Sequence, residues 1–148
     1  MMPANVQDIS RQLVVFSLAE EEYALPITRV QEIIRYEEPT SVASHTRWIR
    51  GVISLRGKIV PVCDLGLRLG VSSEPTHDAK IVIVETEGST AGVVVDEVEE
   101  VLTVESEQVE SAPAADGELI EAIAKVDERL IILLDPDGLF AVMEFSER

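Results

Sequence analysis

Two nearly continuous apolar runs constrain the fold of this chain more than any other feature. They occupy residues 80–85 and 90–96, on either side of a short polar turn at residues 86–89. Strands with apolar residues on both faces are usually buried on both faces. The sequence therefore predicts a hairpin at the centre of the molecule, most simply between two lobes. Gly92, inside the second run, indicates a bulge or the close approach of another backbone.

The remaining core is expected to be aliphatic and built from strands. Hydrophobic residues make up 46% of the 148 positions but aromatic residues only 4%, which leaves mostly Val, Ile and Leu to fill the interior. β-branched residues favour strands, and this length suits one domain or two small lobes. Further strands are predicted at residues 14–18, 22–26, 52–55, 59–62, 98–104, 120–126 and 130–134. Polar connections are expected at 71–79 and 106–117, and a short terminal turn after Pro136.

Two short helices are predicted between the strands. Ile27, Val30, Ile33 and Ile34 recur at helical spacing, which predicts an amphipathic helix and leaves Glu32 off its apolar stripe, free to meet a partner. A second helix of about one turn is expected after Asp64, which has the character of an N-cap, with a glycine stop at residue 70.

The dipeptide Arg56-Gly57 separates two β-branched runs and predicts a tight hairpin with Arg56 at its solvated tip. Arg47, Arg50 and Lys58 lie nearby, and no acidic residue occurs between Glu38 and Asp64, although the formal net charge is -16. The patch is either a docking surface for an acidic partner or a solvated turn that happens to be basic, and charge alone does not separate the two.

Nothing in the sequence forms a recognisable catalytic or metal-binding constellation. His45 and His77 lie in polar segments without a second ligand at helical or strand spacing, and the single cysteine, Cys63, has the context of a small buried hydrophobe. No glycine-rich phosphate loop is present. We therefore expect a non-enzyme without metal or cofactor.

The charge and hydropathy also bear on location. A strongly acidic chain is repelled by nucleic acid and by anionic lipid, and no apolar run reaches the roughly 18 residues that a membrane-spanning helix needs. We expect a cytoplasmic protein that neither binds nucleic acid nor inserts directly into a membrane.

An ordered set of motifs resembles the CheW family of chemotaxis coupling proteins. The motifs lie at residues 14–18, 22–26, 29–33, 50–57, 59–65, 92–98 and 130–135. The likeness spans roughly residues 12–140, with a loose lead-in at 1–11 and a tail at 141–148. It implies a mainly β fold in which two SH3-like, five-stranded barrels pack around a shared hydrophobic core, with short helices.

The resemblance also implies a function as a scaffold that links chemoreceptor cytoplasmic tips to the regulatory domain of the histidine kinase CheA in membrane-bound receptor arrays. Seven residues match positions that matter for coupling in the family: Val30, Glu32, Gly51, Arg56, Ile81, Gly92 and Val101. Arg56 and Glu32 are the best candidates for polar partner contacts, while Gly51 and Gly92 are expected to hold turns or bulges. Which residues face the receptor and which the kinase stays open.

Two departures from the family pattern are interpreted as tolerated variation. Ser54 stands where members often have asparagine, and Cys63 where they usually have an aliphatic residue. Three other functions stay open: a CheW-like adaptor of a pilus or gliding pathway, a small β-barrel that binds a ligand in its interior, and a small hydrolase with a carboxylate pair. The last requires a buried acid in a cleft.

Overall fold

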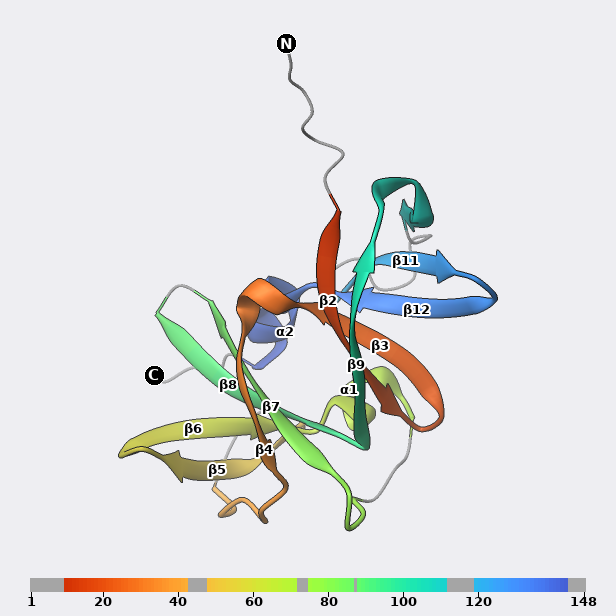
Figure 1. The fold of residues 1–148 in the computed structure, drawn as a ribbon. Helices are drawn as coiled ribbons and strands as arrows, with labels where there is room; N and C mark the ends of the chain where they lie inside the picture. Colours follow the sequence, from red (N-terminus) through yellow and green to blue (C-terminus); the bar gives the residue numbers. More distant parts are fainter. Residues whose placement is uncertain (1–9, 43–47, 72–74, 87, 112–118, 144–148) are drawn as a thin grey trace.

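The structure, a computed structural model, describes residues 10–42, 48–71, 75–86, 88–111 and 119–143. Most of these residues form two β-sheets, which we call the first and second lobes (Figure 1). The first lobe contains β2 (Arg11–Leu18), β3 (Glu21–Pro26), β9 (Glu97–Val104), β10 (Val109–Ser111), β11 (Ile120–Val126) and β12 (Arg129–Leu134). The second contains β4 (Val30–Arg35), β5 (Ile49–Leu55), β6 (Lys58–Cys63), β7 (Lys80–Thr86) and β8 (Ser89–Val95).

The two sheets have related pairing patterns. The first has the order β10-β11-β12-β3-β2-β9, in which β12 runs parallel to β3, and the second has the order β4-β7-β8-β6-β5, in which β6 runs parallel to β8. The helical segments are short: η1 (Ile27–Arg29), α1 (Leu65–Leu69), η2 (Ser106–Gln108) and α2 (Pro136–Met143). In each lobe a tight hairpin, β5–β6 or β11–β12, leads into an α-helix.

The central hairpin is confirmed as β7–β8, and its two faces serve different cores. Val82 and Val93 face a cluster shared by both lobes, whereas their neighbours Ile81 and Ile83 face the interior of the second lobe. All four are fully buried. This alternation explains why both runs are apolar throughout, since neither face of the hairpin meets water.

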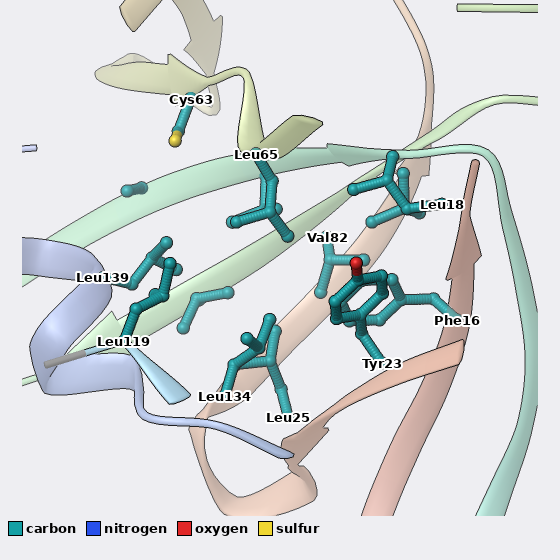
Figure 2. Close-up of a cluster of buried hydrophobic side chains, with 14 of the residues drawn as sticks. Phe16, Leu18, Tyr23, Leu25, Cys63, Leu65, Val82, Leu119, Leu134 and Leu139 are labelled. Atoms are coloured by element: carbon teal, nitrogen blue, oxygen red, sulfur yellow. The ribbon is translucent and has the colours of Figure 1, made fainter. Parts of the chain in front are cut away.

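Three apolar clusters hold the fold together. The shared core between the lobes consists of Phe16, Leu18, Tyr23, Leu25, Ile49, Cys63, Leu65, Val82, Val84, Ala91, Val93, Val95, Leu119, Leu134 and Leu139 (Figure 2). Smaller clusters centred on Val15 and Ile131 in the first lobe, and on Val62 and Ile81 in the second, fill the two lobes. The expected mainly β architecture, two lobes around a shared core, is therefore confirmed, but the sheet of the first lobe has six strands where five were expected, because the short strand β10 adds to its edge.

The helix predicted across residues 27–34 is wrong. Only Ile27–Arg29 is helical, as one 3-10 turn, and strand β4 follows, paired antiparallel to β7. A bulge explains the misleading pattern: Val30 pairs with Val84 and Glu32 with Ile83, so Gln31 has no partner across the ladder. The extra residue puts Val30 and Ile33, three positions apart, on the same face, which imitates helical spacing.

The predictions for the other connections had mixed outcomes. The N-cap and glycine stop are confirmed, since the Leu67 N–H donates to Asp64 Oδ1 at 3.1 Å and Gly70 adopts a left-handed conformation. The predicted loop at 106–117 is wrong in its first half, because Ser106–Gln108 form a 3-10 turn and β10 pairs with β11. Its second half, like residues 72–74 of the connection 71–79, lies outside the described residues. At the other end, α2 is longer than the expected turn and runs to Met143.

Candidate functional site

The Arg56-Gly57 turn has the predicted geometry. The φ angles of Arg56 and Gly57 are 52° and 82°. Two successive positive φ values are what a two-residue hairpin turn of type I′ requires. The turn projects the Arg56 side chain outward, where 69% of it is exposed. The interpretation of Arg56 as a reachable cation at a hairpin tip is thus confirmed.

Glu32 lies on the opposite edge of the same sheet, and Arg56 reaches it. In the strand order of the second lobe, β4 and β5 are the two edge strands. The Arg56 guanidinium donates two hydrogen bonds to the Glu32 carboxylate, Nη1 to Oε2 and Nη2 to Oε1, the latter at 2.8 Å. Such a bidentate pair fixes both geometry and distance. The pair therefore fastens one edge of the second lobe to the hairpin at the other.

This ion pair corrects one expectation and sets the electrostatics of the site. Glu32 was expected to be free, but its carboxylate is engaged by Arg56 within the chain. The hydrogen bond from Arg56 holds the pKa of Glu32 below its ordinary value, and the same bond raises the pKa of Arg56. The ion pair stays charged at neutral pH and presents a guanidinium and a carboxylate side by side at the surface.

Backbone pairing also joins β5 to the segment that follows β4. The Thr40 N–H donates to the Val52 carbonyl at 2.8 Å, and the Val52 N–H donates to the Thr40 carbonyl at 2.9 Å. Gly51 makes this approach possible, because a Cβ on it would lie 2.2 Å from the Thr40 carbonyl oxygen. The β5–β6 register also shifts between Ile49 and Gly51. The expectation that Gly51 holds a backbone irregularity is confirmed.

Two further predicted residues support the second lobe from inside. Ile81 is fully buried, and a Cβ added to Gly92 would lie 2.7 Å from its Cγ2 atom. Gly92 pairs with Ile83 in an unshifted register, so the glycine reflects close approach and not a bulge. Neither residue is placed to contact a partner directly. Their close packing fixes the shape of the second lobe.

The other two predicted residues lie apart from this group. Val30 is half-buried and packs against the shared core at the start of β4. Val101 is 54% exposed on β9, opposite Val14, and thus belongs to the first lobe. The structure brings Glu32 together with Arg56 and Ile81 together with Gly92, but it does not join Val101 to either pair.

The basic patch is smaller than the sequence indicated. Arg50 Nε lies 3.2 Å from Asp64 Oδ2, so the N-cap of α1 also neutralises one member of the patch. His45 and Arg47 lie outside the described residues. Arg56 and the exposed Lys58 are the cations that remain at the tip.

Sequence reasoning missed a second arginine of the same kind. Arg129, at the start of β12, donates to Glu22 at 3.0 and 3.1 Å and to Glu100 at 2.7 Å. These bonds raise the pKa of Arg129. The sequence signal for Arg129 is its position, because it directly follows a tight turn between two apolar runs. Lys58 has the same position after the turn Arg56-Gly57.

The described residues also bear on the alternative functions. They contain no group of three His, Cys, Asp or Glu side chains able to hold a metal ion. Cys63 is buried, and burial raises the pKa of its thiol to about 12, as expected of a small core residue. Where the structure describes helices, none has the length and apolarity to cross a bilayer. Aliphatic clusters fill the interior of both lobes, which does not favour a barrel with a ligand inside.

Comparison with known proteins decides the family. The sequence model described as a CheW-like domain matches residues 12–144. The chain belongs to the CheW family. The chemotaxis protein CheW of Bacillus subtilis is 35% identical over 133 residues, covering 86% of this chain and 85% of that protein. The crystal structure of the scaffolding protein TtCheW from Thermoanaerobacter tengcongensis superposes with a TM-score of 0.83 at 39% identity, covering 89% of this chain and 93% of that one.

Membership of the CheW family makes the chain an adaptor or scaffold of chemotaxis signalling, and it fits a protein without catalytic activity. A likeness to the protein PilI of Pseudomonas aeruginosa is weaker and partial: 29% identity over 84 residues, 56% of this chain and 47% of that protein. An adaptor of another chemosensory pathway therefore has less support than a chemotaxis scaffold.

Proposed function

We propose that this chain links the cytoplasmic tips of methyl-accepting chemoreceptors to the regulatory domain of the histidine kinase CheA, in the cytoplasm and within receptor arrays. One observation carries the proposal at the level of residues: the exposed Glu32–Arg56 pair, built where two edges of the second lobe meet, in a chain with the CheW-like domain over residues 12–144. A chemotaxis scaffold needs such a surface, because it acts by contact alone.

Arg56 is suited to a contact with another protein. Its bonds to Glu32 use two of the five N–H donors of a guanidinium, and most of the side chain remains exposed. Glu32 meanwhile fixes the direction of a long side chain that would otherwise lose rotamer freedom on binding. The ion pair would therefore present a preorganised cation to an acidic group of receptor or kinase.

The way signals pass through such an adaptor follows from linkage. A change at the receptor alters kinase output through the adaptor only if the adaptor binds two kinase states with different affinity. Modest pairwise affinities are enough, since an array multiplies weak contacts. Equal affinity for kinase locked on and kinase locked off would contradict this part of the proposal.

The direct test is a pull-down of wild-type protein and Arg56→Glu with the CheA regulatory domain and with a receptor cytoplasmic hairpin of the same organism. We expect the wild type to bind both and Arg56→Glu to lose at least one. If the folded wild type binds neither, the proposal fails in favour of a different adaptor pathway.

A charge swap separates partner contact from internal support. Arg56→Glu combined with Glu32→Arg restores an ion pair within the chain but reverses its direction. If Arg56 contacts a partner, the double variant stays defective in binding although its stability recovers. Recovery of binding would show instead that the pair acts only by closing the lobe.

A further inference from the structure

A groove lies in the first lobe. Its volume is about 730 Å³, and its lining residues are Ser17, Glu20, Glu21, Glu22, Glu99, Ile123, Arg129, Leu130 and Ile132. These residues come from β2, β3, β9 and the β11–β12 hairpin, all in the sheet opposite to that of Glu32 and Arg56. The groove therefore lies apart from the Glu32–Arg56 pair, on which the proposed coupling of receptor and kinase rests.

The floor of the groove is apolar. It is formed by the face of the β11–β12 hairpin that covers the shared core, because this face continues past the edge of that core. Ile132 packs against the shared core, and Ile123 lies opposite it across the ladder. Leu130, two residues before Ile132, continues the same face but is 62% exposed. A leucine this exposed beside two half-buried isoleucines leaves apolar surface that a partner could cover.

The rim of the groove is acidic. Four of its lining residues are glutamates and one is an arginine, and Arg129 already serves Glu22 and the neighbouring Glu100. No ion pair engages Glu20, Glu21 or Glu99 among the residues that the structure describes. The rim thus keeps three carboxylates available to a cationic group.

Local backbone irregularities place two of these carboxylates. The β2–β3 turn holds Ala19 and Glu20 at φ values of 53° and 71°, in the left-handed region that glycine or asparagine usually occupies. The Ala19 N–H donates to Asp96 Oδ2 at 2.8 Å, which holds the turn. On β9, Val98 pairs with Phe16 and Glu100 with Val15, so Glu99 is the extra residue of a bulge. Bulges and strained turns of this kind re-aim side chains.

We propose that this groove binds a segment of another protein in which lysine or arginine residues flank an exposed apolar side chain. The apolar side chain would cover Leu130, Ile123 and Ile132, and the flanking cations would lie against Glu20, Glu21 and Glu99. Charge complementarity identifies this class of partner, since an acidic or neutral segment would leave the rim carboxylates uncompensated while burying the floor.

The test uses the full chain and a short fluorescent peptide in which lysine alternates with leucine, compared with a peptide that alternates glutamate with leucine. We expect anisotropy titrations to show binding of the first peptide only. Leu130→Ser should weaken binding at least tenfold, whereas Ile59→Ser, a similarly exposed isoleucine in the second lobe, should leave it unchanged. Methyl shifts on titration should fall on Leu130, Ile123 and Ile132.

A second pair of variants separates specific binding from general attraction to an acidic protein. The double variant Glu20→Gln, Glu99→Gln should bind the lysine peptide several-fold more weakly than the wild type. The double variant Glu37→Gln, Glu38→Gln, which makes an equal charge change elsewhere, should not weaken this binding. Equal effects of both pairs, or methyl shifts outside the groove, would overturn the proposal. So would absence of peptide binding together with self-association that depends on Leu130, because the occupant would then be a second copy of this chain.

Discussion

The two lobes use different contacts to join strands that are not neighbours in their sheets. In the second lobe a backbone pair, Thr40 with Val52, joins the segment after β4 to β5, and the ion pair of Arg56 with Glu32 links β4 to the β5–β6 hairpin. In the first lobe side chains make the links: Arg129 on β12 bonds Glu100 on β9 as well as Glu22 on the adjacent β3, and Arg11 on β2 bonds Glu121 on β11.

The difference separates an arginine available to a partner from one that stabilises the fold. Arg129 is 34% exposed and serves two carboxylates, whereas Arg56 is 69% exposed and serves one. Backbone hydrogen bonds already join β5 to the segment after β4, so Arg56 is not the sole contact that holds this part of the second lobe together. We therefore expect the two arginines to have different roles, Arg56 in binding a partner and Arg129 in stabilising the fold.

The largest expected effect comes from the backbone link of the second lobe. Gly51→Ala would place a methyl group 2.2 Å from the Thr40 carbonyl oxygen and separate Thr40 from Val52. We expect a loss of about 2–4 kcal/mol in the free energy of unfolding, measured by urea denaturation. Gly57→Ala is the control: its Cβ meets no atom within 4 Å, so only backbone strain of about 1 kcal/mol is expected. Equal losses would contradict the importance of the Thr40 contact.

Removal of the first-lobe clamp should have the next largest effect on stability. Arg129→Met leaves Glu22 and Glu100 close together without their shared cation. After allowance for solvent screening we expect a loss of about 1 kcal/mol, part of which Glu100→Gln should restore in the double variant. Arg11→Met, which removes one well-exposed ion pair, should cost less than about 0.5 kcal/mol. A larger loss of stability for Arg11→Met than for Arg129→Met would contradict the account of Arg129 as the main side-chain link of the first lobe.

Arg56→Gln should change stability less than Arg129→Met but binding more. The backbone link remains, so the urea midpoint should move only slightly. Binding of at least one of the two proposed partners should nevertheless weaken at least tenfold, while folded Arg129→Met should bind the kinase regulatory domain and receptor hairpin as the wild type does. The reverse assignment, with Arg129 required for binding and Arg56 dispensable, would contradict the distinction between the two arginines.

The smallest effect is a pH dependence that belongs to the second lobe. The pKa of Glu32 is lowered in the folded state, so its contribution to stability is present above the ordinary carboxyl pKa of 4.5 and is lost as the pH falls through the lowered value. The difference in urea midpoint between wild type and Arg56→Gln should therefore shrink below that pH. A difference that stayed constant down to pH 3 would show that the pair contributes nothing through charge.

The sequence predicted the parts of this arrangement that depend on short-range pattern. The turn at Arg56-Gly57, the cap at Asp64 and the doubly buried hairpin each have a local signature, and each is confirmed. Strand β4 was mistaken for a helix because the bulge at Gln31 shifts the alternation by one residue. A bulge depends on the partner strand, which no local pattern describes.

The contacts between segments far apart in the chain could not be predicted from the sequence for a similar reason. Glu32 and Arg56 were each singled out, but their mutual bond follows from the curvature that brings β4 to the β5–β6 hairpin. Arg129 was not singled out, because its two carboxylates lie 107 and 29 residues away along the chain. The need for Gly51 became visible only with Thr40 beside it.

The most direct test of the proposed coupling is whether this chain recruits CheA to receptor-containing membranes. We predict that the kinase sediments with the membranes when the wild-type chain is present, stays in the supernatant without it, and also stays there with Arg56→Glu. Kinase that sediments equally well with no adaptor, with the wild type and with Arg56→Glu would contradict the proposed link between receptor and kinase.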